Sequence, residues 1–188
     1  KYYSFLNQGE VYSRLSIPDS AYLYFNKSLE FAKTAADEDF IGMSLTGLGR
    51  SFYKMGSYDQ SLRNYQGAIA YLKKANNNET LCEATLGMAG LYQYLNQPDS
   101  AVLLASLSLR ISNQGGFLSK ELEAAQFLTN HYKKLKNIDS AFSYLNYVDK
   151  LNDSLNSKDR IRRLQLISSN EQFRQIEIAE GKKLAKKE

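Results

Sequence analysis

One pattern of residues returns every 40 positions, and it limits the folds that this chain can adopt. Aspartate stands at Asp19, Asp59, Asp99 and Asp139, and a small residue follows two positions later in every copy. The four copies keep this register without an insertion. Self-similarity at a fixed period of about 20 to 50 residues is typical of solenoids and other repeat arrays. The chain is therefore predicted to be a row of four similar units.

Further columns of the pattern indicate that each unit is a pair of antiparallel helices. A glycine or alanine lets a partner helix approach closely, and an aromatic residue three positions later fills the gap on the same helix face. On the second helix, small and large residues follow at i, i+4 and i+7, along one face. The columns hold, in chain order, Gly9, Gly49, Ala89 and Thr129; Tyr12, Phe52, Tyr92 and Tyr132; Ala21, Ser61, Ala101 and Ala141; Phe25, Tyr65, Ala105 and Leu145; and Ser28, Ala68, Ser108 and Val148.

These columns resemble the tetratricopeptide repeat, and the second copy, "LTGLGRSFYKMGSYDQSLRNYQGAI", is the most similar to it. The resemblance implies an all-α fold, a right-handed α-solenoid of four helix pairs plus a C-terminal helix. The usual period of that family is about 34 residues, so a period of 40 implies longer helices or links. Ala105 departs from the pattern because a large residue is usual there, and Thr129 and Val148 depart because small residues are usual.

The predicted array covers residues 2–155, and a C-terminal capping or stalk helix covers residues 156–188. The repeats are expected at about 2–37, 38–77, 78–117 and 118–155. The expected helices are 2–15, 18–35, 38–55, 58–75, 78–95, 98–113, 118–135 and 138–155, with a separate ninth helix at 158–184.

The charge distribution argues against a nucleic-acid partner. The chain has 188 residues and a net charge of +4. Residues 1–157 hold 15 basic and 15 acidic residues, and residues 158–188 hold 9 basic and 5 acidic residues. The array itself is thus neutral, whereas a nucleic-acid-binding domain normally carries a basic stripe.

The sequence also offers no basis for an enzyme, a metal site or a cofactor. His131 and Cys82 are the only histidine and cysteine, too few for a zinc set. They belong to different units, so we do not expect a catalytic pair. The column of His131 holds Val11, Ser51 and Leu91, which indicates a packing site.

Function in this fold resides in the groove that the first helix of each pair lines. The mixture of charged, amide and aromatic residues expected there suits an extended peptide or a helix of a partner protein; the alternative is a face that is merely solvated. Tyr53 and Tyr94, with Arg50 and Lys54, combine the residue types that dominate recognition hot spots. The predicted groove residues are Glu10, Arg14, Met43, Arg50, Tyr53, Lys54, Glu83, Gln93, Tyr94, Asn130, Lys133 and Lys134.

The C-terminal segment resembles the junction of Bacteroidetes-type signalling proteins. In those proteins extracytoplasmic tetratricopeptide repeats end in a phrase like "LNDSL", here residues 151–155, and a charged helix leads to a membrane span. The resemblance implies a periplasmic sensor region whose basic end, "GKKLAKKE", lies near a membrane. A homodimer through the C-terminal helix is a further option. The alternative is a soluble cytoplasmic adaptor or peptide-responsive regulator.

Overall fold

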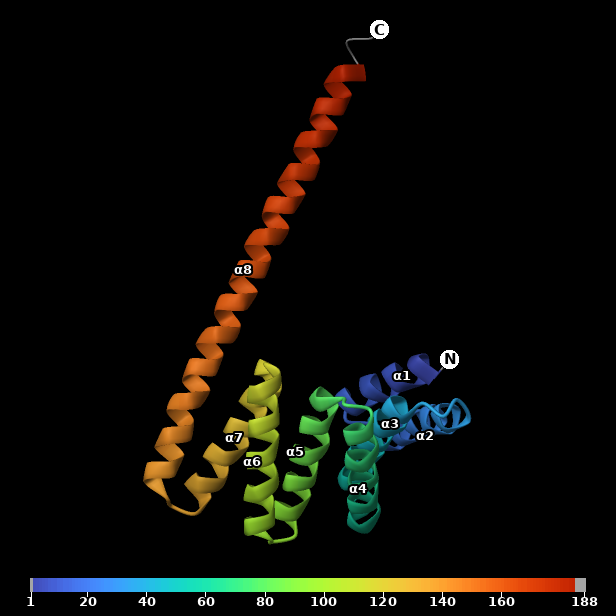
Figure 1. The fold of residues 1–188 in the computed structure, drawn as a ribbon, viewed down its shortest axis with the longest axis vertical. Coiled ribbons are helices and arrows are strands. Elements are labelled where there is room, and N and C mark those ends of the chain that lie inside the picture. The colour runs from blue at the N-terminus through green and yellow to red at the C-terminus, as the bar shows by residue number, and fades with distance from the viewer. Residues whose placement is uncertain (1, 185–188) are drawn as a thin grey trace. The chain divides into compact units, whose positions relative to one another are not determined.

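A computed structural model describes residues 2–184, and all of its regular structure is helical (Figure 1). The helices form antiparallel pairs, one pair for each repeat. Their bounds are α1 Tyr2–Arg14, α2 Pro18–Thr34, α3 Glu38–Lys54, α4 Tyr58–Lys74, α5 Asn78–Tyr94, α6 Pro98–Gly115, α7 Leu118–Lys134 and α8 Ile138–Leu184. The predicted all-α solenoid is confirmed.

The predicted break between an eighth and a ninth helix is wrong. Helix α8 runs without interruption over 47 residues. Neither proline nor glycine occurs between Ile138 and Glu180, so nothing in this stretch removes a backbone donor or favours a helix end. The chain divides into two compact units, Lys1–Val148 and Asp149–Glu188, and the division falls within α8. The boundary expected from the sequence, after residue 155, lies seven residues later.

The seven turns share one backbone geometry at a spacing of 20 residues. Each turn contains one residue with a positive φ, and the backbone N–H of the next residue donates to a carbonyl five positions back, as in Ile17 to Tyr12 and Ser57 to Phe52. This is the hydrogen bond that defines the Schellman motif. The positive-φ residues are Ser16, Ala36, Gly56, Asn76, Asn96, Gly116 and Lys136. The regular turns explain why the repeats keep register.

The first two units are joined by an aromatic ring that lies between two glycines. Phe25 of α2 is fully buried, and a Cβ added to Gly9 of α1 or Gly47 of α3 would come within 2.6 or 2.5 Å of its ring. Tyr65 of α4 lies in the same way between Gly49 of α3 and Gly87 of α5. The small residues of the pattern therefore make room for one ring in each of these units.

In the third unit the small and the large residue of this contact are exchanged between the two helices. Ala105 of α6 stands where Phe25 and Tyr65 stand in the first two units, and Phe127 of α7 stands in the column of Gly47 and Gly87. Ala105 is fully buried, and Phe127 packs against the cluster that contains it. The departure noted at Ala105 is thus compensated by an aromatic residue on the next first helix.

Serine at the crossings adds a hydrogen bond to close packing. Ser61 of α4 donates from its hydroxyl to the carbonyl oxygen of Gly49 at 2.7 Å. Ser108 of α6 donates to the carbonyl oxygen of Cys82 at 2.8 Å. Both serines are fully buried, as is Ala101. Burial of a polar group is tolerated here because its hydrogen bond is made.

Candidate functional site

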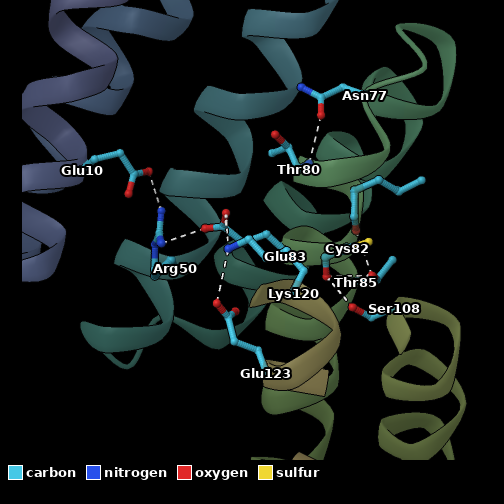
Figure 2. Close-up of polar contacts among 11 residues, drawn as sticks. Glu10, Arg50, Asn77, Thr80, Cys82, Glu83, Thr85, Ser108, Lys120 and Glu123 are labelled. Carbon is cyan, nitrogen blue, oxygen red and sulfur yellow. Dashed lines mark hydrogen bonds and ion pairs between the residues drawn. The ribbon is translucent and has the colours of Figure 1, made fainter. Parts of the chain in front are cut away.

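An ion-pair chain of five side chains crosses four helices on one side of the array (Figure 2). Arg50 of α3 is at its centre: Nη2 lies 2.6 Å from Oε1 of Glu10 on α1, and Nη1 lies 2.7 Å from Oε1 of Glu83 on α5. Lys120 of α7 lies 3.5 Å from both Glu83 and Glu123. First helices of all four repeats are thus connected through charged groups.

Partial burial of the ion-pair chain changes the pKa values of its members. Removal from water raises the pKa of Glu10 above its ordinary value, against the opposing effect of the Arg50 guanidinium. Burial by itself would lower the pKa of Arg50, but the carboxylates of Glu83 and Glu10 outweigh it and keep the guanidinium charged. Among the described residues, Nε of Arg50 is buried without a hydrogen-bond partner. The site therefore holds charges that are paired but incompletely solvated.

Two adjoining cavities open over this ion-pair chain, and together we call them the central groove. Their volumes are about 440 and 300 Å³. Both include Glu10, Arg14, Thr46, Glu83 and Lys120 in their walls. The first continues to Arg50, Tyr65, Leu86, Gly87 and Glu123, and the second continues to Leu6, Asn7, Met43, Glu79 and Thr80. Five of the twelve residues predicted for the binding surface line this groove: Glu10, Arg14, Met43, Arg50 and Glu83.

Three tyrosines form a separate aromatic cluster. The rings of Tyr53 and Tyr94 meet edge to face with centroids 6.1 Å apart, and Tyr58 of α4 lies 4.5 Å from Tyr94. A hydrogen bond with Tyr94 raises the pKa of Tyr58 to about 12. Tyr94 is 58% exposed, so the cluster offers aromatic surface to a partner. Tyr53 and Tyr94, both predicted for the binding surface, are thus neighbours, and Tyr58 contacts both of them.

Two of the predicted cations, Arg50 and Lys54, contact groups of neighbouring helices. Arg50 is occupied by two carboxylates, and Nζ of Lys54 donates to the carbonyl oxygen of Ser13 at 2.9 Å. Both cations therefore tie α3 to its neighbouring helices. The sequence does carry a signal for this: Glu10 and Arg50 occupy the same column in adjacent repeats and have opposite charges.

Apart from Glu83, the predicted residues of the third and fourth units lie outside the central groove. Nε2 of Gln93 is 3.4 Å from Nδ1 of His131. Asn130 and Lys134 are exposed on α7, and Lys133 lines another cavity at the turn between α7 and α8. Lys120 was missed because its column holds Phe40 and Thr80, which are not charged.

Cys82 and His131 are both buried in the array. Cys82 is a buried free cysteine, and desolvation raises the pKa of its thiol to about 11. A thiol with such a pKa is protonated near neutral pH and is a weak nucleophile. His131 is buried, and its ring meets Tyr132 edge to face, in agreement with a packing role. Across residues 2–184, no helix combines the length and the apolar character needed to span a membrane.

Comparison with known proteins identifies solved structures that have a similar fold. No protein-family model matches the chain. The FLUORESCENT IN BLUE LIGHT protein of Arabidopsis thaliana is 26% identical over 96 residues, which cover 51% of this chain and 30% of that protein. The tetratricopeptide-repeat domain of that protein superposes with a TM-score of 0.55 at 23% identity, covering 60% of this chain and 95% of the domain.

Two further structures superpose over more of the chain. Aspartyl phosphate phosphatase F of Bacillus subtilis gives a TM-score of 0.76 at 15% identity over 83% of this chain and 41% of its own. A signal-transduction ATPase of Pyrococcus horikoshii with a tetratricopeptide-repeat sensor gives 0.67 at 15% identity over 85% of this chain and 25% of its own. The chain thus spans less than half the length of each of these two proteins. Together with the helix pairs and their columns, these similarities show that the chain has the tetratricopeptide-repeat fold.

Proposed function

We propose that this chain is a non-catalytic interaction module that binds a segment of a partner protein in the central groove. The observation that carries the proposal is the convergence of charged side chains from α1, α3, α5 and α7 on adjoining cavities. A groove that several repeats build together suits a ligand that extends across them. The fold neighbours include a sensor and a phosphatase, so the fold itself does not select a partner.

The chemistry of the groove favours a ligand that carries charged side chains, including a basic one. Its walls hold four carboxylates, Glu10, Glu79, Glu83 and Glu123, against three cations, Arg14, Arg50 and Lys120. Two of these cations are already paired within the ion-pair chain. A basic side chain of the ligand would therefore meet excess negative charge, and its binding would weaken as salt rises.

Selection from a displayed peptide library tests the groove directly. The whole chain is immobilised, and enriched peptides are measured again on a Met43→Lys/Glu79→Lys variant, which makes the groove wall more positive. A matched control is Glu30→Lys/Leu103→Lys, which makes the same changes of charge and apolar surface at exposed positions of α2 and α6. We expect enriched peptides to share basic residues, to lose at least about tenfold in affinity on the groove variant and to keep their affinity for the control. Equal affinity for both folded variants would contradict the proposal.

We further propose that this module is the extracytoplasmic sensor region of a membrane signalling protein. The resemblance of the segment after Leu151 to such junctions supports this, and so does the unbroken helix α8, through which a displacement of its first turns would be transmitted. The membrane proximity of the basic end and a dimer through this helix belong to the same proposal. The gene that encodes the chain tests it: a signal peptide upstream and an apolar span downstream are expected. The absence of both would favour a cytoplasmic adaptor.

A further inference from the structure

An apolar surface is exposed at the end of the array, beside the turn between α7 and α8. Ile138 is 78% and Phe142 is 63% exposed, and they border a cavity of about 450 Å³ with Ala141 and Leu145. Lys133 and Lys136 stand at its edge. We call this surface the end slot. It is separate from the central groove, because none of its residues lines that groove.

The repeat pattern shows what kind of element covers the same columns elsewhere. Phe142 belongs to the column of Tyr22, whose ring lies 5.3 Å from Phe52 of α3. Leu145 belongs to the column of Phe25, which packs against Gly47 of α3. In the first unit these positions are thus covered by the first helix of the next unit. The end slot therefore lies where the first helix of a further repeat would pack.

The opposite end of the array is built differently. Val11 of α1 is 54% exposed, whereas Leu91 in the same column is fully buried. Beside it, Gln8 is exposed in the column where Leu48 and Met88 are buried. Helix α1 therefore exposes a mixed face, in which the polar Asn7 and Gln8 stand beside Val11, whereas the end slot is apolar. A second copy is a poor occupant, because its α1 carries Asn7 and Gln8 in the columns of Gly47 and Leu48, and two end slots that face each other would bring lysines against lysines.

We propose that the end slot is a docking site for an amphipathic helix of another protein with an acidic residue near its C-terminal end. The position of the acidic residue follows from the first unit, where Lys54 near the end of α3 donates to the carbonyl of Ser13. Lys133 occupies the column of Ser13. A helix docked in register would place its counterpart of Lys54 beside Lys133 and Lys136, where a carboxylate is favoured and a lysine is repelled.

A pair of synthetic peptides tests both parts of this proposal. Both contain residues 37–55 of this chain, acetylated and amidated at their ends, since α3 covers the equivalent columns in the first unit. One has the substitution Lys54→Glu, and the other keeps Lys54. In fluorescence anisotropy with the whole chain, we expect the Lys54→Glu peptide to bind at least about fivefold more tightly. Phe142→Asp should weaken its binding at least about tenfold, and Leu103→Asp, at an equally exposed leucine of α6, should leave it unchanged.

Charge reversal separates a specific contact from general attraction to a basic chain. A Lys133→Glu/Lys136→Glu variant should invert the preference, so that the peptide with Lys54 binds more tightly. Lys33→Glu/Lys73→Glu, at exposed positions elsewhere, should preserve the original order. Absence of binding, binding that Phe142→Asp does not alter, or a preference that is not inverted would overturn the proposal. A dimer in light scattering that Phe142→Asp abolishes would also overturn it, by showing that a second copy covers the slot.

Discussion

At the scale of single residues, the structure separates glycines that packing requires from those that it does not. A Cβ at Gly47 would lie 2.5 Å from the ring of Phe25, which is fully buried, whereas a Cβ at Gly90 meets nothing within 4 Å. We expect Gly47→Ala to lower the free energy of unfolding by about 1–3 kcal/mol through overpacking. Gly90→Ala should raise it by about 0.5–1 kcal/mol, because alanine favours a helix interior. Urea denaturation measures both, and a stabilised Gly47→Ala would contradict the packing described for Phe25.

The reactivity of Cys82 is a second test at this scale. Its pKa rises from 9.0 to about 11 because the thiol is desolvated. Two pKa units reduce the thiolate fraction at pH 8 about a hundredfold, and the thiolate is the reactive form. We therefore expect the native chain to react with a disulfide reagent at least about a hundredfold more slowly than the same chain unfolded in urea. Similar rates in both states would show that Cys82 is accessible and ionised.

At the scale of helices, the ion-pair chain should stabilise the array in a pH-dependent way. Arg50→Met leaves Glu10 and Glu83 without their shared cation. Because these groups are about one-third exposed, the loss at pH 7.5 should be about 1–2 kcal/mol, between values for exposed and buried pairs. Burial raises the pKa of Glu10 above its ordinary value, so protonation relieves the unpaired carboxylate of the variant as the pH falls. The loss should therefore shrink as the pH falls.

An exposed ion pair provides the control for that experiment. Lys74 of α4 lies 3.3 Å from Glu38, with both side chains largely in solvent. Lys74→Met should cost less than about 0.5 kcal/mol at either pH. Urea denaturation at pH 7.5 and 4.5 measures both variants. A loss for Arg50→Met that is the same at the two pH values would mean that packing of the guanidinium, and not its charge, stabilises the array.

The sequence predicted the helices well because their pattern is periodic, and it predicted contacts between columns less well. The burial of Ala101 follows from its column alone. The compensation of Ala105 by Phe127 does not, because it joins different columns of two units. The turns show the same limit: Gly56 suggests a left-handed residue, but Ala36 and Lys136 adopt that conformation too, and nothing in their side chains indicates it. Pairing across the groove depends on helix spacing, which the sequence does not show.

At the scale of the whole molecule, the array should fold without most of the C-terminal helix. The three core clusters draw their buried residues from Leu6 to Leu128. Of the side chains that are described after Val148, only Leu151 is buried. Repeat arrays are stabilised by contacts between neighbouring units, so a segment that buries little adds little to stability. We expect a chain that ends at Ser157 to melt within about 2 °C of the full chain.

Thermal melting of both chains, followed by circular dichroism at equal molar concentration, measures this difference in Tm. The same experiment distinguishes the capping helix from the stalk helix, the two roles predicted for the C-terminal segment. A capping helix covers apolar surface, so its removal would cost about 2 kcal/mol or more and lower Tm by more than about 5 °C, since about 1 kcal/mol corresponds to about 2–4 °C in a domain of this size. A stalk contributes helical signal without stability, so its removal would reduce the ellipticity and leave Tm in place. The exposed side chains of Asp153, Ser154 and Lys158 favour the second result, because surface that stays in solvent contributes no burial.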